Sequence, residues 1–161
     1  MARQHKQLEV AFLGGVGEIG KNMTALQFGN DIIIVDCGST FPSVDDTPGI
    51  DLIVPDFAFI KANIEKVKGI LITHGHEDHI GGIPHLLSEC GNIPIYGSSL
   101  AIALIRHKLT ERKINMPKMH VVKNGDVKKV GAFSVEFVSV SHSILGAFAL
   151  AITYPDGVVF H

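Results

Sequence analysis

The sequence predicts one α/β domain in which antiparallel hairpins flank a central region of alternating strands and helices. Short runs of β-branched and other apolar residues, bounded by Gly, Pro, Asn and Asp, recur along the whole chain. Segments near the middle have the apolar spacing of helices. Apolar residues make up 46% of the 161 residues and charged residues 19%. This composition suits a globule with one core and excludes disordered and fibrous chains.

The first third of the chain is predicted to form strands followed by a long loop. Strands are expected over Leu8–Leu13, Met23–Phe28 and Ile32–Asp36. The turn residues Gly29-Asn30-Asp31 join the last two in a hairpin. Proline-rich residues 40–56 are expected to be a loop with a brief extended piece at 52–54. A helix over 56–64, capped by Asp56, follows it.

The middle of the chain alternates between strand and helix, and the end turns to strands. We expect a buried strand over 68–73, a helix over 83–90, a short strand over 93–96 and a longer helix capped by Ser98. Further strands are expected over 119–122, 127–130, 133–140, 147–154 and 158–160.

Six consecutive residues, His74-Gly75-His76-Glu77-Asp78-His79, follow the predicted strand 68–73. Alternation along an extended segment puts His74 and His76 on the same side, so both can reach one ion. Asp78 and His79 lie where the chain turns into a helix and can reach a second point nearby. Imidazole and carboxylate ligands favour Zn²⁺ and also admit Mn²⁺ or Fe²⁺, and the lack of thiolates is typical of an open catalytic site. The cluster therefore predicts two neighbouring metals.

Two residues outside the cluster are candidates for the same site. His142 follows a predicted strand and could supply a third ligand to the first metal, although its position suits a surface histidine equally well. Asp36 ends a buried strand, where it could hold a metal-bound imidazole through its other N–H or could instead cap the loop at Gly38-Ser39. The remaining histidines, His85, His107 and His120 among them, have no ligand-type partners in sequence and receive no metal role.

The glycine-rich segment Gly15–Gly20 matches the G-x-G-x-x-G pattern of dinucleotide-binding folds, and Asp36 closes a later strand at about the expected distance. A crossover helix, however, would have to fit within residues 21–31, which contain no helical stripe. We therefore expect these glycines to form a tight loop whose backbone approaches a neighbouring site, and not to bind a nucleotide.

The cluster has the H-x-H-x-D-H signature of the metallo-β-lactamase superfamily, and the chain closely resembles its ribonuclease J branch. The residues that carry this resemblance are Gly14–Asn22, Val35–Gly38, Gly49–Asp51, Pro55-Asp56, Ile80–Gly82 and Ser141–Ser143, together with the cluster itself. The cluster alone identifies only the superfamily. The combination with the first glycine loop is specific to the ribonuclease family.

The resemblance implies an αββα sandwich of mixed sheets with flanking helices, of which residues 1–161 would form the amino-terminal part. In the family this part is followed by a β-CASP domain and carboxy-terminal regions that are absent from this chain. His74, His76 and His142 would hold one zinc, Asp78 and His79 the other, and Asp36 would support them. The same residues could hold Mn²⁺ in place of zinc.

The implied activity is that of a cytoplasmic ribonuclease that cleaves RNA internally and from the 5′ end. A metal-bridging hydroxide would attack the phosphodiester, and Asp78 could accept or relay the proton of the nucleophile. Without the later strands we expect weak or no activity, and self-association through apolar residues exposed near Val158–Phe160.

Two alternatives remain open beside the ribonuclease. The same ligands serve lactonases, glyoxalases and lactamases of the superfamily, and the chain could also be a non-catalytic metal-binding fragment. The net charge of −2 gives no overall basic surface, so attraction for RNA must come from a local patch, the metals or other parts of the protein. The polar start and the lack of a long apolar run indicate no signal peptide or membrane span, and Cys37 and Cys90 are expected to be reduced.

Overall fold

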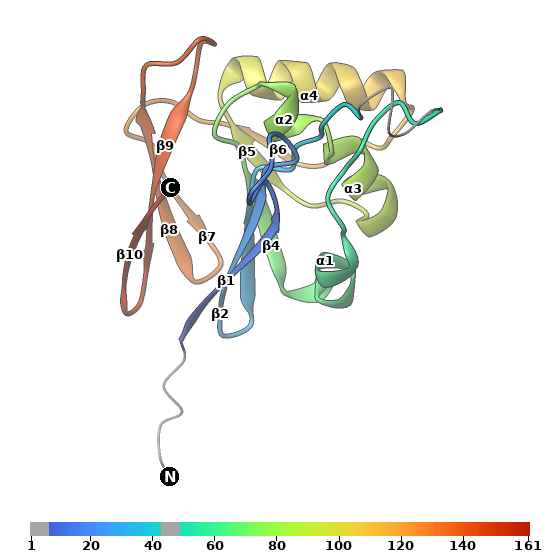
Figure 1. Cartoon of the computed structure of the whole chain (residues 1–161). Helices are drawn as coiled ribbons and strands as arrows, with labels where there is room; N and C mark the ends of the chain where they lie inside the picture. Colours follow the sequence, from blue (N-terminus) through green and yellow to red (C-terminus); the bar gives the residue numbers. More distant parts are fainter. Residues whose placement is uncertain (1–6, 43–48) are drawn as a thin grey trace.

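The computed structural model describes residues 7–42 and 49–161, and these form two sheets with helices on one side (Figure 1). Within these ranges a six-stranded sheet has the order β1-β2-β3-β4-β5-β6 and a four-stranded sheet has the order β10-β9-β8-β7. The helices cover the face of the larger sheet that points away from the smaller one (Figure 1). This arrangement confirms the predicted mixed sheets with flanking helices. The polar start, residues 1–6, and residues 43–48 of the predicted loop lie outside the described residues.

The larger sheet is antiparallel at one end and parallel at the other. Its strands are β1 (Leu8–Gly14), β2 (Met23–Phe28), β3 (Asp31–Val35), β4 (Val67–Leu71), β5 (Ile95–Gly97) and β6 (Met119–Val121). β1, β2 and β3 pair antiparallel, whereas β3, β4, β5 and β6 pair parallel. The four parallel strands therefore end at one edge, which is where ligands collect in α/β sheets.

The smaller sheet is an antiparallel meander. Its strands are β7 (Val127–Val130), β8 (Phe133–Ser139), β9 (Phe148–Tyr154) and β10 (Gly157–Phe160). Alternate residues of β8, namely Phe133, Val135 and Phe137, are fully buried against the larger sheet, where they meet Ile33 and Leu71. This period of two matches the alternation expected for a half-buried strand.

The helices differ from the sequence predictions mainly in length. They are α1 (Ala58–Ala62), α2 (Glu77–Ile80), α3 (Ile83–Cys90) and α4 (Ser99–Glu111), with a 3₁₀ turn, η1, over Ile64–Lys66. Ser98 caps α4, as predicted, since its side chain accepts a hydrogen bond from the Ala101 N–H. The helix expected over 56–64 is shorter at both ends. It begins at Ala58, whose N–H the Asp56 carboxylate accepts at 2.8 Å, and beyond Asn63 the chain tightens into η1.

Among the residues that the structure describes, no helix has the length and apolar character required to cross a membrane.

Candidate metal centre

The histidine-rich loop lies at the edge where the parallel strands end. β4 ends at Leu71, the loop carries His74 and His76, and α2 starts immediately afterwards at Glu77. His76 is the last extended residue before the helix, with φ −70° and ψ 154°. Gly75 packs against α4, where a Cβ would come within 2.8 Å of Leu104 Cδ1 and that side chain would have to shift. The loop is thus held between two elements of the core.

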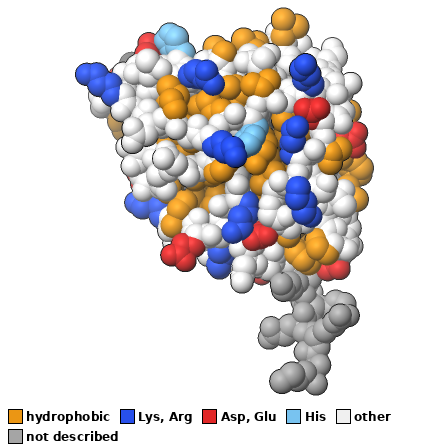
Figure 2. Space-filling model, turned by 180° about the vertical axis from the view of Figure 1, so that it is seen from behind, with side chains coloured by type: hydrophobic (Ala, Val, Ile, Leu, Met, Phe, Trp, Pro, Cys, Tyr) orange, Lys and Arg blue, Asp and Glu red, His pale blue; other side chains and the backbone are white. Residues whose placement is uncertain are grey.

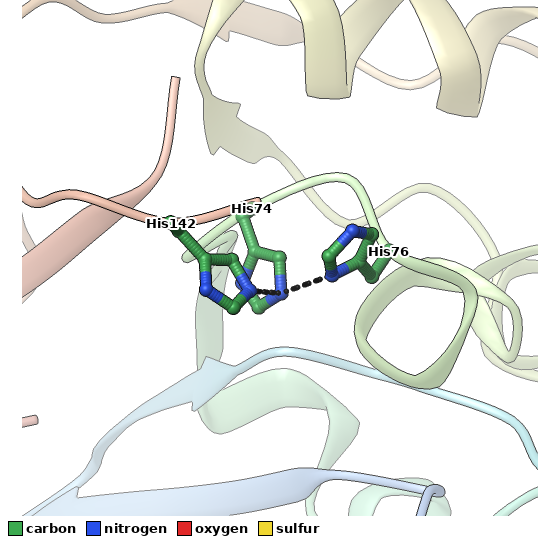
Figure 3. A group of neighbouring side chains, drawn as sticks. All are labelled: His74, His76 and His142. Atoms are coloured by element: carbon green, nitrogen blue, oxygen red, sulfur yellow. Dashed lines mark hydrogen bonds between the residues drawn. The ribbon is translucent and has the colours of Figure 1, made fainter. Parts of the chain in front are cut away.

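Three imidazoles converge at this loop (Figure 3). His74 Nε2 lies 3.0 Å from His76 Nδ1 and 3.2 Å from Nε2 of His142, which comes from the segment after β8. The three nitrogens all lie within 4.8 Å of one another. Nitrogens bound to one tetrahedral zinc at about 2.0–2.1 Å lie roughly 3.3 Å apart. The three donors therefore fit a single metal ion.

Asp78 and His79 form a second group of ligand atoms beside the first. Asp78 Oδ2 and His79 Nε2 are 3.4 Å apart, and the ring centroids of His74 and His79 are separated by 4.0 Å. Both side chains project from α2, one turn after the histidine loop. The two groups are therefore neighbours, as the ligands of two adjacent metals must be.

Asp36 lies behind both groups and is almost completely buried. Its Oδ2 accepts hydrogen bonds from His79 Nδ1 and from the Thr73 hydroxyl, both at 2.7 Å, and its Oδ1 accepts from the Thr73 N–H at 2.8 Å. A carboxylate at this depth is satisfied only because three donors surround it. Asp36 therefore fixes the neutral His79 ring with its proton on Nδ1, which leaves Nε2 free to accept a metal.

Burial and charge shift the pKa values of His74 and His79 in opposite directions. Burial, assisted by nearby His79, lowers the pKa of His74 to about 4. Burial alone would also lower the pKa of His79, but the hydrogen bond and charge of Asp36, together with Asp78, outweigh it and raise that pKa. At neutral pH His74 is therefore uncharged, the form in which imidazole binds metals.

The glycine segment after β1 lies next to this centre and does not form a nucleotide site. β1 and β2 pair antiparallel and are joined without a helix, so the βαβ unit that a dinucleotide fold requires is absent from these described residues. The segment instead lines a cavity of about 180 Å³ that also contacts Asp36 and His79. The expectation of a tight loop beside a site is confirmed.

Comparison with known proteins identifies the family. The sequence model of the family described as the Metallo-beta-lactamase superfamily matches residues 16–146. The chain belongs to the metallo-beta-lactamase superfamily. The solved metallo-beta-lactamase fold protein YhfI from Bacillus subtilis superposes with a TM-score of 0.65 at 22% identity, over 95% of this chain and 61% of that chain.

Curated relatives of this metallo-beta-lactamase superfamily chain include bacterial proteins named Ribonuclease J. The one from Corynebacterium glutamicum is 44% identical over 154 residues, which cover 96% of this chain and 21% of the relative. The one from Mycolicibacterium smegmatis is 43% identical over 154 residues, which cover 96% of this chain and 27% of that relative. The chain thus spans between a fifth and about a quarter of the length of these relatives.

The superfamily signature found His74, His76, Asp78 and His79, but two residues that contact them were not singled out from the sequence. The Thr73 hydroxyl lies 3.0 Å from His74 Nδ1 and connects that ring to Asp36. Asn22 Nδ2 lies 3.2 Å from Asp78 Oδ2 and 3.3 Å from His79 Nε2. Thr73 could have been found by its place next to His74, whereas Asn22 is 56 residues away from Asp78 and was marked only as the end of the segment Gly14–Asn22 that carries the resemblance.

Three further histidines of the described residues lie outside the centre. His85 accepts from Arg112 at 2.9 Å, His107 pairs with Glu111 on α4, and His120 stacks on Tyr96. His161 lines the cavities beside His142 and His79. Glu77 is not among the converging ligands and forms an ion pair with Lys108 at 2.6 Å.

Proposed function

We propose that residues 1–161 form the amino-terminal, metal-binding part of the catalytic domain of a ribonuclease. The convergence of His74, His76 and His142 beside Asp78 and His79 carries the hydrolytic part of this proposal. Similarity to proteins named Ribonuclease J supports RNA as the substrate. The greater length of those relatives supports further regions, including a β-CASP domain, in the complete protein.

Zn²⁺ is the metal that we propose for both positions, with Mn²⁺ as a substitute. His74, His76 and His142 would hold one ion, and Asp78 and His79 would contribute to the other. Neutral imidazoles and a carboxylate, without thiolates, are the donor set of catalytic zinc sites. Two such ions supply a nucleophilic water at neutral pH and offset the charge of the phosphate under attack.

The side chains of this centre would bind, orient and move protons. Asp36 would keep the His79 ring oriented directly and the His74 ring through Thr73. Asp78, 40% exposed at its side chain, would accept the proton of the attacking water. The two free cysteines, Cys37 and Cys90, suit the reducing cytoplasm, which is where we place the protein.

The activity is tested on the complete protein with single-stranded RNA, a lactone, a thioester and a β-lactam. We expect metal-dependent cleavage of RNA alone, and we expect Asp78→Asn to lower the rate about 100-fold or more. Asp156→Asn, in the exposed turn before β10, is the control and should leave the rate unchanged. Hydrolysis of another substrate with RNA intact contradicts the ribonuclease and favours a different superfamily hydrolase. Bound metal with no hydrolysis of any substrate favours a metal-binding function.

A further inference from the structure

The charges of this chain are distributed unevenly along its sequence. Although the net charge is −2, eight of the fourteen Lys and Arg residues lie between residues 106 and 130, together with only two of the sixteen Asp and Glu residues. This segment runs from the second half of α4 through β6 to β7. One part of an acidic protein is therefore strongly basic, which is the local patch that binding to a polyanion requires.

Several of these cations lie together at the edge of the larger sheet. β6 is the last strand of that sheet among the described residues. Lys118 and Lys128 lie near His120 of β6, and burial, assisted by the charges of these two lysines, lowers the pKa of that ring. Lys128 is paired only loosely with Asp126, at 3.4 Å. The cations on this face thus exceed what the neighbouring carboxylates neutralise.

An apolar groove lies between α4 and the same edge strand, β6. It has a volume of about 500 Å³ and is lined by Ile102, Ala103 and the half-exposed Val121, with Arg106, His107 and Glu111 at its polar side. Figure 2 shows this face, where blue Lys and Arg side chains surround a band of orange hydrophobic side chains with a pale blue histidine among them. The surface therefore combines positive charge with apolar area.

Across β6 from the groove, on the face turned toward the smaller sheet, the rings of Tyr96 and His120 are stacked, with centroids 4.4 Å apart and planes inclined by 6°. Proteins that bind single-stranded nucleic acid pair a basic groove with flat rings and apolar side chains against which bases stack. An acidic peptide would use the charges and the free edge of β6 but would not need the stacked rings.

We propose that the surface formed by Arg106, Lys118, His120, Val121 and Lys128 binds single-stranded RNA, with phosphates on the cations and bases against the groove. This β6 surface shares no residue with the metal centre, so it would hold a part of the RNA other than the scissile bond. The inference rests on the proposed ribonuclease function for the identity of the nucleic acid.

The test measures binding of a fluorescently labelled 12-nucleotide RNA to the purified chain by anisotropy, with chelator present so that no metal contributes. The variant Lys118→Glu/Lys128→Glu should bind at least about tenfold more weakly. Its plot of log affinity against log salt should be shallower by about 1.4, which is 0.7 for each lost phosphate contact. His120→Ala should weaken binding about threefold or more and leave the salt slope unchanged.

Lys61→Glu/Lys66→Glu, on α1 and η1, makes the same change in net charge and should bind RNA like the wild type. Equal loss in this control, or unchanged affinity in Lys118→Glu/Lys128→Glu, would overturn the inference. Poly-glutamate that competes as well as RNA would also overturn it and indicate an acidic protein partner. In the complete wild-type protein, RNA binding at this surface without any hydrolysis refutes only the proposed function, and hydrolysis of RNA without binding at this surface refutes only the β6 surface.

Discussion

At the scale of single residues, hydrogen bonds sort the ring nitrogens into those that keep a proton and those that offer a lone pair. His79 Nδ1 donates to Asp36, and His74 Nδ1 lies 3.0 Å from the Thr73 hydroxyl, which itself donates to Asp36. One buried carboxylate thus orients a ring from each of the two ligand groups. The lone pairs of both Nε2 atoms are directed away from Asp36, toward the space between the ligands.

This sorting predicts the order in which the histidines of the metal-free chain titrate. His79 should protonate at a higher pH than an ordinary histidine because Asp36 stabilises its charged form. His74 should stay neutral until the pH falls to about 4, because burial and the neighbouring ring disfavour its charge. Two-dimensional ¹H–¹⁵N NMR of the imidazoles measures both. In the urea-unfolded chain both should titrate near 6.5, and a His74 that titrates at that value in the folded chain would contradict the geometry.

Part of this metal centre was predictable from the sequence because its residues are close together in the chain, and the rest was not. The ligand spacing from His74 to His79 follows from one strand-to-helix turn. Asp36 was a candidate because a buried carboxylate needs donors, although the sequence left open what those donors were. Asn22 and Thr73 act through contacts that depend on how two segments of the sheet are placed, and neither residue type stands out in its own sequence context.

At the scale of elements, the short helix α2 is held in place by the segment that follows β3. Asp36–Ser39 pairs with it backbone to backbone: Cys37 N–H donates to His79 O at 2.9 Å and Ser39 N–H to Glu77 O at 3.2 Å. Asn22 N–H donates to Asp78 O at 3.0 Å from the other side. A helix of four residues has almost no stability of its own, so these bonds position Asp78 and His79.

Gly38 is the closest point of this contact, since a Cβ there would overlap the carbonyl of Asp78. We expect Gly38→Ala to displace α2, to lower the free energy of unfolding by about 1–3 kcal/mol and to weaken binding at the Asp78–His79 position. Thermal unfolding and metal stoichiometry measure these effects. Gly17→Ala is the control, because its Cβ meets nothing within 4 Å; its φ of +73° costs some stability, but the variant should keep full metal binding. Wild-type stability and stoichiometry in Gly38→Ala would refute this role.

Elements whose apolar residues recur with a clear period were predicted well, and elements without such a period were not. β2 and α3 have the bounds expected from sequence, because alternating or helical apolar spacing extends over their whole length. The sequence placed Asp78 and His79 where the chain turns into a helix, but the helix was expected only from residue 83, since the four residues of α2, made mostly of ligands, have no apolar stripe. α2 is helical because the backbone of residues 36–39 holds it, which is a tertiary effect.

At the scale of the whole molecule, the two sheets differ in size, and apolar side chains remain exposed at their outer strands. Val10 and Phe12 of β1 and Val158 and Phe160 of β10 are between 46% and 80% exposed. Helices cover only the larger sheet among the described elements (Figure 1). The exposure expected near the last strand is confirmed. Uncovered apolar surface and open strand edges favour association.

We therefore expect the 17.3 kDa chain to self-associate at micromolar concentrations. Phe12→Ser/Phe160→Ser should shift it toward monomer, because both side chains lie on outermost strands. Leu145→Ser is the control, since Leu145 is 83% exposed but lies in the loop before β9. Sedimentation velocity over a range of concentrations measures the effect, and a wild-type chain that stays monomeric throughout would refute the prediction.

The central claim, that the histidine loop and His142 form a metal site, is tested most directly by the zinc content of the purified chain. Wild type and His76→Ala are equilibrated with buffered zinc and analysed by mass spectrometry, with His107→Ala as the control because His107 is exposed on α4 and pairs only with Glu111 among the described residues. The wild type and His107→Ala should bind zinc equally, and His76→Ala should bind it about tenfold or more weakly. Unchanged zinc in His76→Ala would contradict the assignment of the site.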